Sequence, residues 1–256
     1  MPFPQYPIHP SLHPSDDVHP KFLRERIESA VIRTLHAAPA EQAASIQSFE
    51  QSITQWTGVE HAVGLSSGSD AITVALMTMG IGPGDEVLTT AFGSFAPLSA
   101  ITRTGAKPVF LDLAPNTYVI DLNRIEAAVS PRTRAIIASH SLGNQVQMRA
   151  LNRLARDHDL LVIEDATQAF GCRQGNLPLG AFGHIACFDF GPDSSLSAPG
   201  QSGMLVTDDT GYAMIARSLR GDDSSHQPEG RTHRRELPDQ STPCSDPRGQ
   251  TRLSRE

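Results

Sequence analysis

A short run of small polar residues is the first stretch of this chain whose residue types and spacing could bind a ligand. Ser66-Ser67-Gly68-Ser69-Asp70 lies between an apolar run typical of a strand and the predicted start of a helix. Backbone N–H groups at a helix start favour a phosphate, and Gly68 would let the anion come close. Ordinary helix capping by Ser67 or Ser69 explains the same residues. The run lacks the spacing of a Walker loop or a dinucleotide fingerprint, which disfavours a nucleotide-binding enzyme.

Two ionisable residues follow predicted strands further along the chain. Asp165 ends the stretch that begins with the apolar run Leu160 to Ile163, and His140 follows the run Ala135 to Ser139. A carboxylate in such a place can pair with a protonated ring nitrogen of a ligand and keep it charged. The alternative is an acid that caps a helix or faces a loop. A lone histidine is more often structural, but its place makes His140 a candidate wall residue of a site.

Alternating strand-like and helix-like segments would position these residues. Strands are predicted at His61 to Leu65, Val87 to Thr89, Pro108 to Leu111, Ala135 to Ala138, Leu160 to Ile163, Ile185 to Phe190 and Met204 to Val206. Helices are predicted at Asp70 to Met79, Pro97 to Arg103, Leu122 to Val129, Met148 to His158 and Tyr212 to Leu219. Ile46, Phe49, Ile53 and Trp56 recur at helical spacing, which predicts a further helix with these residues in the core. The alternation predicts a three-layer α/β/α fold with a mainly parallel sheet, whose ligands bind beyond the carboxyl ends of the strands.

The composition divides the chain into three parts. Residues 1–21 contain six prolines and predict an extended arm, whereas residues 22–220 carry the periodic apolar pattern. Residues 221–256 contain only Leu237, Cys244 and Leu253 as apolar residues, so we expect a disordered polar tail.

Charge and cysteine content exclude several classes of function. The net charge of -7 argues against a nucleic-acid partner, and no apolar run approaches the length needed to span a membrane. The three cysteines have no metal-binding spacing, and the amino-terminal residues show no secretory signal. We therefore expect a soluble cytoplasmic protein with reduced thiols and no metal site.

Several short sequence motifs, in the same order along the chain, resemble those of the DegT-type sugar aminotransferases. This family has the aspartate-aminotransferase fold and uses pyridoxal 5′-phosphate (PLP). The best matches are Ser66–Ala71, Gly80–Val87, Thr104–Phe110, Ile120–Asp121, Ser130–Ile137 and Val162–Ala169. The resemblance implies amino transfer from glutamate to a keto group of a nucleotide sugar, in polysaccharide or secondary-metabolite synthesis, by a homodimer. It further implies that Gly68 and Ser69 hold the cofactor phosphate, that Asp165 pairs with the pyridinium nitrogen and that Gln168 approaches the ring hydroxyl.

The departures from the family pattern concern the catalytic centre. The family lysine that forms the Schiff base is Ser194 here, so no residue of this chain is assigned as catalytic. Only two lysines are present, Lys21 in the arm and Lys107 before a strand. A family serine that assists the phosphate is Asp189, whose charge opposes phosphate binding and puts PLP binding in question. Ser94 replaces a family aromatic that stacks on the cofactor, with Phe95 beside it as a candidate wall residue. The sequence also stops short of the family's small carboxyl-terminal domain, which we expect to be missing.

Three functions follow from these observations. The chain is a homologue that does not transaminate, an active sugar aminotransferase, or a lysine-free PLP-dependent sugar dehydratase in which another residue, such as His140 or His184, acts as base. The absent lysine favours the first, because serine cannot form an imine.

Overall fold

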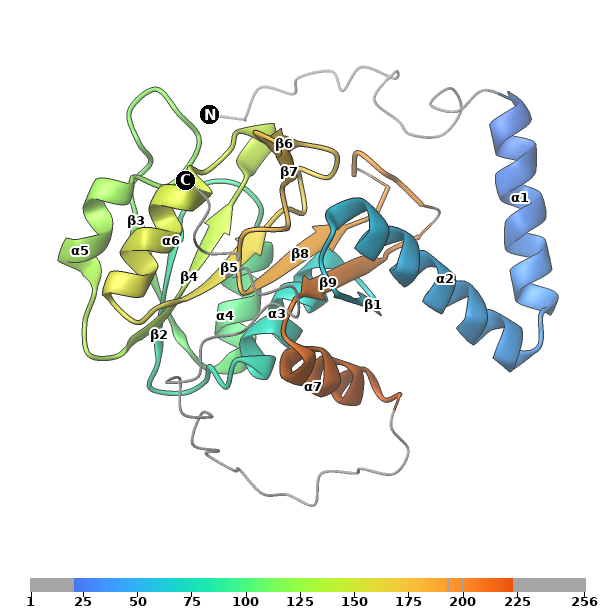
Figure 1. Cartoon of the computed structure of the whole chain (residues 1–256), viewed down its shortest axis with the longest axis horizontal. Helices are drawn as coiled ribbons and strands as arrows, with labels where there is room; N and C mark the ends of the chain where they lie inside the picture. Colours follow the sequence, from blue (N-terminus) through green and yellow to red (C-terminus); the bar gives the residue numbers. More distant parts are fainter. Residues whose placement is uncertain (1–20, 193, 199, 223–256) are drawn as a thin grey trace, which may run out of the picture. The chain divides into compact units, whose positions relative to one another are not determined.

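The computed structural model describes residues 21–192, 194–198 and 200–222 (Figure 1). The elements belong to a compact unit that ends at Asp222. The predicted arm, residues 1–21, lies outside the described residues apart from Lys21, which already begins helix α1 (Lys21–His36). The predicted tail, residues 221–256, also lies outside them apart from its first two residues. Among the described residues, no helix combines the length and apolar composition needed to cross a bilayer.

A seven-stranded sheet forms the centre of this unit, in the order β1-β9-β8-β5-β4-β2-β3. Its strands are β1 (His61–Leu65), β2 (Glu86–Thr90), β3 (Lys107–Leu111), β4 (Thr133–Ser139), β5 (Leu161–Asp165), β8 (Ile185–Asp189) and β9 (Gly203–Thr207). The five strands from β8 to β3 pair in parallel, whereas β9 runs antiparallel to both β8 and β1. The mainly parallel sheet predicted from the sequence is confirmed, and the reversed strand β9 is what the alternation could not predict.

Helices cover both faces of the sheet, as Figure 1 shows. They are α2 (Pro39–Thr57), α3 (Gly68–Thr78), α4 (Ala96–Thr104), α5 (Ile125–Ala128), α6 (Met148–Asp157) and α7 (Thr210–Arg220). Alternate residues of one strand face opposite layers: Ile137 of β4 packs in the cluster that contains α3 and α4, and Ile136 packs with α5 and α6. Short 3₁₀ turns, η2 (Leu122–Arg124) and η3 (Ser141–Gly143), and a small hairpin of β6 (Arg173–Gln174) and β7 (Leu177–Pro178) complete the fold.

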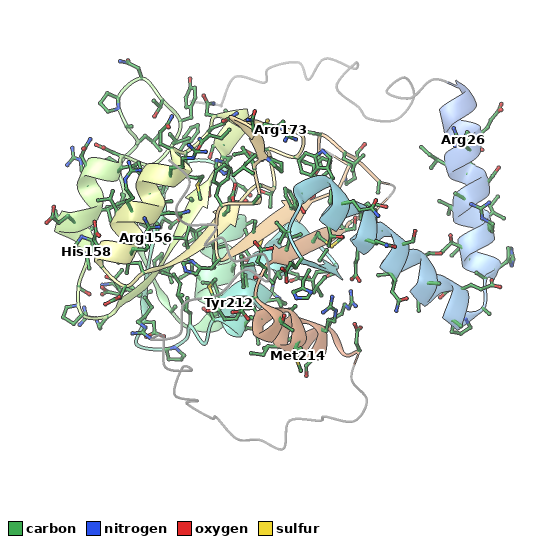
Figure 2. All side chains as sticks on the ribbon, in the orientation of Figure 1. Arg26, Arg156, His158, Arg173, Tyr212 and Met214 are labelled. Carbon is green, nitrogen blue, oxygen red and sulfur yellow. The ribbon has the colours of Figure 1, made fainter. Side chains whose placement is uncertain are left out.

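The periodic apolar residues of α2 are less buried than their spacing predicts. Ile53 is 3% exposed, but Ile46 and Phe49 are 51% and 39% exposed. Phe49 still meets Phe190, with ring centroids 5.2 Å apart. Only part of the helix lies against the sheet, so the prediction that all four residues lie in the core is wrong for Ile46 and Phe49. Helix α7 is divided more sharply: Ala213 and Ala216 are buried, while Met214 points outward and is 65% exposed (Figure 2).

Strand β1 lies at one edge of the sheet, and its outward backbone groups are bound by side chains. The Gly64 N–H donates to the Glu50 carboxylate at 2.7 Å, and the Gly64 carbonyl accepts from Arg220 Nη1 at 3.0 Å. Arg220 Nη1 also donates to Glu50 Oε1 at 2.5 Å. The last helix and α2 are therefore joined through one residue of the edge strand.

Candidate functional site

Gly203, the first residue of β9, lies between two strands that contribute to the candidate site. Gly203 pairs with Leu65 of β1 on one side and with Asp189 of β8 on the other. A Cβ atom at Gly203 would lie 2.2 Å from the carbonyl carbon and oxygen of Ser67 and 2.6 Å from the amide nitrogen of Gly68. Only glycine therefore lets the loop after β1 lie over β9 and reach the end of β8.

Asp189, which ends β8, holds this loop through its carboxylate. The Gly68 N–H donates to Asp189 Oδ2 at 2.9 Å. The Gly191 N–H and the Ser194 hydroxyl donate to Asp189 Oδ1 at 2.6 Å and 2.9 Å. One carboxylate thus joins the start of α3 to the segment that carries Ser194.

The first turn of α3 contains the polar run that the sequence singled out. Ser67 is the N-cap, and its hydroxyl accepts from the Asp70 N–H at 3.1 Å. Ser66 donates to the Asp70 carboxylate, and Arg103 of α4 donates to it at 2.6 Å. These two hydrogen bonds, Ser66 first, lower the pKa of Asp70. The capping explanation of the run is present in the structure, and Ser69 lies beside it, half-buried.

Asp165, at the end of β5, is 2% exposed and both of its carboxylate oxygens accept hydrogen bonds. Ser139 of β4 donates to Oδ2 at 2.7 Å. The Thr167 hydroxyl and N–H donate to Oδ1 at 2.6 Å and 3.2 Å. Asp165 and Ser139 are register partners in neighbouring parallel strands, which is why they meet.

Glu164 is a buried acid that sequence reasoning missed. It is 0% exposed and accepts from the N–H groups of Gly180, Phe182 and Gly183 at 2.6, 3.0 and 3.2 Å. His140 Nε2 lies 3.0 Å from Glu164 Oε1, and its Nδ1 accepts from the Val146 N–H at 3.1 Å. The ring is 1% exposed, so this geometry supports the structural interpretation of His140 over that of a wall residue. The signal for Glu164 was its place directly after the apolar run Leu160 to Ile163, within the strand.

The two remaining predicted site residues lie on the surface. Gln168 is exposed, and its side-chain oxygen accepts from the Leu142 N–H at 3.1 Å. Phe95 flanks the start of α4 and is 71% exposed. The cofactor contacts assigned to Gly68, Ser69, Asp165 and Gln168, and the wall role of Phe95, remain predictions.

Lys107 lies at the amino ends of the parallel strands, whereas Asp165 and Asp189 lie at their carboxyl ends. It begins β3 and pairs with Glu86, the first residue of the parallel strand β2, with Nζ 3.4 Å from Glu86 Oε1. Ser130 and Arg132 bind the same carboxylate at 2.6 Å and 2.8 Å and, with Ser130 the larger cause, lower the pKa of Glu86 to about 2. The Lys107 amine therefore lies at the other ends of the strands from Asp165 and Asp189.

Comparison with known proteins shows the family of this chain. The model of the DegT/DnrJ/EryC1/StrS aminotransferase family matches residues 22–237, so the chain belongs to this family. It is 40% identical over 199 residues to a UDP-N-acetyl-3-dehydro-alpha-D-glucosamine 3-aminotransferase of Acidithiobacillus ferrooxidans, covering 78% of this chain and 53% of that protein. The chain spans about half the length of the curated relatives it matches.

Solved structures show the same fold. The structure of S. venezuelae DesV in complex with a ketimine intermediate superposes with a TM-score of 0.74 at 35% identity, covering 80% of this chain and 56% of that chain. The structure of ntda from Bacillus subtilis, with the cofactor PMP bound, has a TM-score of 0.71 at 28% identity, covering 77% of this chain and 44% of that chain. Both neighbours support the fold expected from the sequence and PLP-type chemistry as the family background.

The residues of this chain fit only part of the cofactor that the family implies. Asp165 lies buried at a strand end, in the place implied for the carboxylate that faces the ring nitrogen. Ser194 carries no amine for an imine, and the Gly68 N–H implied for the phosphate already donates to Asp189. A covalently held, phosphate-anchored PLP therefore does not fit this arrangement.

Proposed function

We propose that this chain is a homologue of the nucleotide-sugar aminotransferases that does not transfer amino groups. The observation that carries the proposal is Ser194 at the position of the Schiff-base lysine, with its hydroxyl donating to Asp189. Transamination by PLP needs a primary amine to form the imine and a base to move the proton. A serine bound to a carboxylate supplies neither.

The remaining parts of the proposal follow from the family. A nucleotide sugar and glutamate are the ligands to test, because the relative from A. ferrooxidans is named for amino transfer to a UDP-sugar. A homodimer is the expected assembly. A cytoplasmic location is favoured by the thiols of Cys172 and Cys187, which are both free.

The glutamate half-reaction tests the proposal without knowledge of the sugar. The full chain is incubated with PLP and glutamate, and formation of 2-oxoglutarate is measured. Borohydride reduction and peptide mapping then search for a pyridoxyl group on Lys21 or Lys107. We expect no 2-oxoglutarate above the protein-free rate and no specific label. Turnover together with a labelled lysine would overturn the proposal.

Rescue variants separate a missing lysine from a damaged site. Ser194→Lys alone should restore no useful turnover, because Asp189 and Ser94 remain. The triple variant Ser194→Lys, Asp189→Ser, Ser94→Phe should bind PLP more tightly than any of its single variants, with effects that are not additive. Ser195→Lys, which places the amine one residue later at an exposed position, is the matched control and should gain nothing. Equal PLP affinity in the single and triple variants would contradict a shared site.

The dehydratase alternative needs a histidine that is free to act as base. His140 Nδ1 accepts from the Val146 N–H, and His184 Nδ1 accepts from the Val162 N–H at 3.0 Å. His140 Nε2 is also engaged by Glu164, in a fully buried place. These contacts disfavour the alternative, and PLP-dependent loss of water from a keto sugar would revive it.

A further inference from the structure

We propose that the Asp189 carboxylate is a built-in anion: it occupies the phosphate position at the start of α3 and closes that position to phosphate from solution. The family background implies an external phosphate at Gly68 and Ser69, and this chain supplies its own negative charge there instead. Asp189 thereby does structurally what a bound anion would otherwise do.

The donors around Asp189 are of the kind and number that an anion requires. They are two backbone N–H groups, from Gly68 and Gly191, and the hydroxyl of Ser194, at 2.6–2.9 Å from the two oxygens. The donors come from two segments more than 120 residues apart in the chain, as Gly68 and Asp189 are separated by 121 residues. A charged acceptor makes stronger hydrogen bonds than a neutral one, so the carboxylate is held at a defined place.

The space beside Gly68 is taken by the same side chain. A Cβ atom built on Gly68 would lie 2.6 Å from Asp189 Oδ2 and 2.8 Å from Asp189 Cβ, and 2.8 Å from Thr167 Cγ2. The side chains of Asp189 and Thr167 therefore pack directly against Gly68. Binding of phosphate at this N–H would therefore require Asp189 to move and would bring two like charges together.

Asp189 serves a different N–H group of α3 from the one that the helix's own cap serves. Helix α3 already has its own cap, since the Ser67 hydroxyl accepts from the Asp70 N–H. The ordinary arrangement is seen at α7, where Asp209 caps its own helix by accepting from the Tyr212 N–H at 2.9 Å. Asp189 reaches a second helix from a distant strand, and the glycine at position 203 makes that approach sterically possible.

The experiment measures anion binding rather than turnover, so its outcome is separate from that of the amino-transfer assay. The full chain and the variants Asp189→Ser and Asp189→Asn are melted in increasing inorganic phosphate at constant ionic strength, and binding is measured by calorimetry. A ligand that binds only the folded state raises the melting temperature with its concentration. Wild-type protein should show no rise. Asp189→Ser, which removes both the charge and the volume, should bind phosphate about tenfold more tightly, the effect of removing a like charge a few ångström away.

Asp189→Asn keeps the shape of the side chain and loses its charge, so it should gain less than Asp189→Ser. It also keeps the inference testable if the serine variant does not fold. Asp209→Ser removes a carboxylate from the start of α7 and is the matched control; it should show no phosphate dependence. Phosphate binding by wild-type protein as tight as by the variants would overturn the inference, as would the absence of any gain in both Asp189 variants.

Discussion

The carboxyl ends of the neighbouring strands β5 and β8 match the family pattern to different extents. Asp165 at the end of β5 is buried and held by Ser139 and Thr167, in the place that the family implies for a cofactor-facing acid. Asp189 at the end of β8 is half-buried and binds Gly68 and Ser194, where the family implies a serine, a phosphate and a lysine. One strand end carries the acid that the family pattern implies, whereas the carboxylate at the other end is engaged in internal hydrogen bonds. Two adjacent strand ends of one sheet can therefore match a family pattern to different extents while the sheet itself is preserved.

The largest loss of stability is expected at Gly203, which lets the loop after β1 approach the end of β8. Gly203→Ala places a Cβ 2.2 Å from the Ser67 backbone, so the loop must move away from Asp189. We expect the free energy of unfolding to fall by about 3 kcal/mol or more, measured by urea denaturation. Gly64→Ala is the matched control in the neighbouring strand, because its Cβ would meet only ordinary contacts at 3.5–3.7 Å. Equal losses in the two variants would show that the close approach at Gly203 does not matter.

A second prediction compares the two acids directly. Asp165 is 2% exposed, so Asp165→Ala removes the acceptor of Ser139 and Thr167 from a place that water does not reach and should cost about 2–3 kcal/mol. Asp189 itself is half-buried, so water can more easily take the place of its carboxylate, and Asp189→Ala should cost about 1 kcal/mol in phosphate-free buffer. Asp165→Asn, which keeps one acceptor oxygen, should fall between wild type and Asp165→Ala. Equal losses for the two alanine variants, measured by the same denaturation, would remove the distinction between the two strand ends.

The smallest effect concerns stability in acid and involves Glu86, at the start of β2. The pKa of Glu86 is lowered from 4.5 to about 2 in the folded protein, so ionised Glu86 stabilises the fold above pH 4.5. That contribution is lost as the pH falls from 4.5 towards 2. Glu86→Gln should therefore flatten the stability curve in this window, measured by thermal melts at successive pH values. Asp70, whose pKa is also lowered, continues to titrate in both proteins. An unchanged slope in Glu86→Gln would contradict the assignment.

Local signals predicted the strands and most helices, because each depends on a short run of residues. The apolar run before Glu164 and Asp165 is an example: it predicts a buried strand, and β5 is found there. Helix α1 was missed because its sequence, KFLRERIESAVIRTLH, shows no strong apolar stripe, and its Val31, Ile32 and Leu35 are exposed. The hairpin of β6 and β7 was missed because two-residue strands leave no periodic pattern.

Long-range register is what the sequence could not provide. The row Leu65–Gly203–Asp189 depends on the reversal of β9 and on which strands become neighbours. The charge of Asp189 was visible in the sequence, but its hydrogen bond to Gly68, 121 residues away, was not. The contact between His140 and Glu164 was hidden for the same reason. His140 follows β4 and Glu164 lies in β5, so the two meet only in the folded sheet.

The contacts that Glu50 and Arg220 make with Gly64 bear on self-association. An edge strand with free N–H and C=O groups is a template for another strand, and β1 is such an edge. Here the outward N–H and carbonyl of its fourth residue are already bound by a carboxylate and a guanidinium. A foreign strand would have to break a charged pair before adding to β1. The Glu50–Arg220 pair therefore opposes the addition of a foreign strand at Gly64.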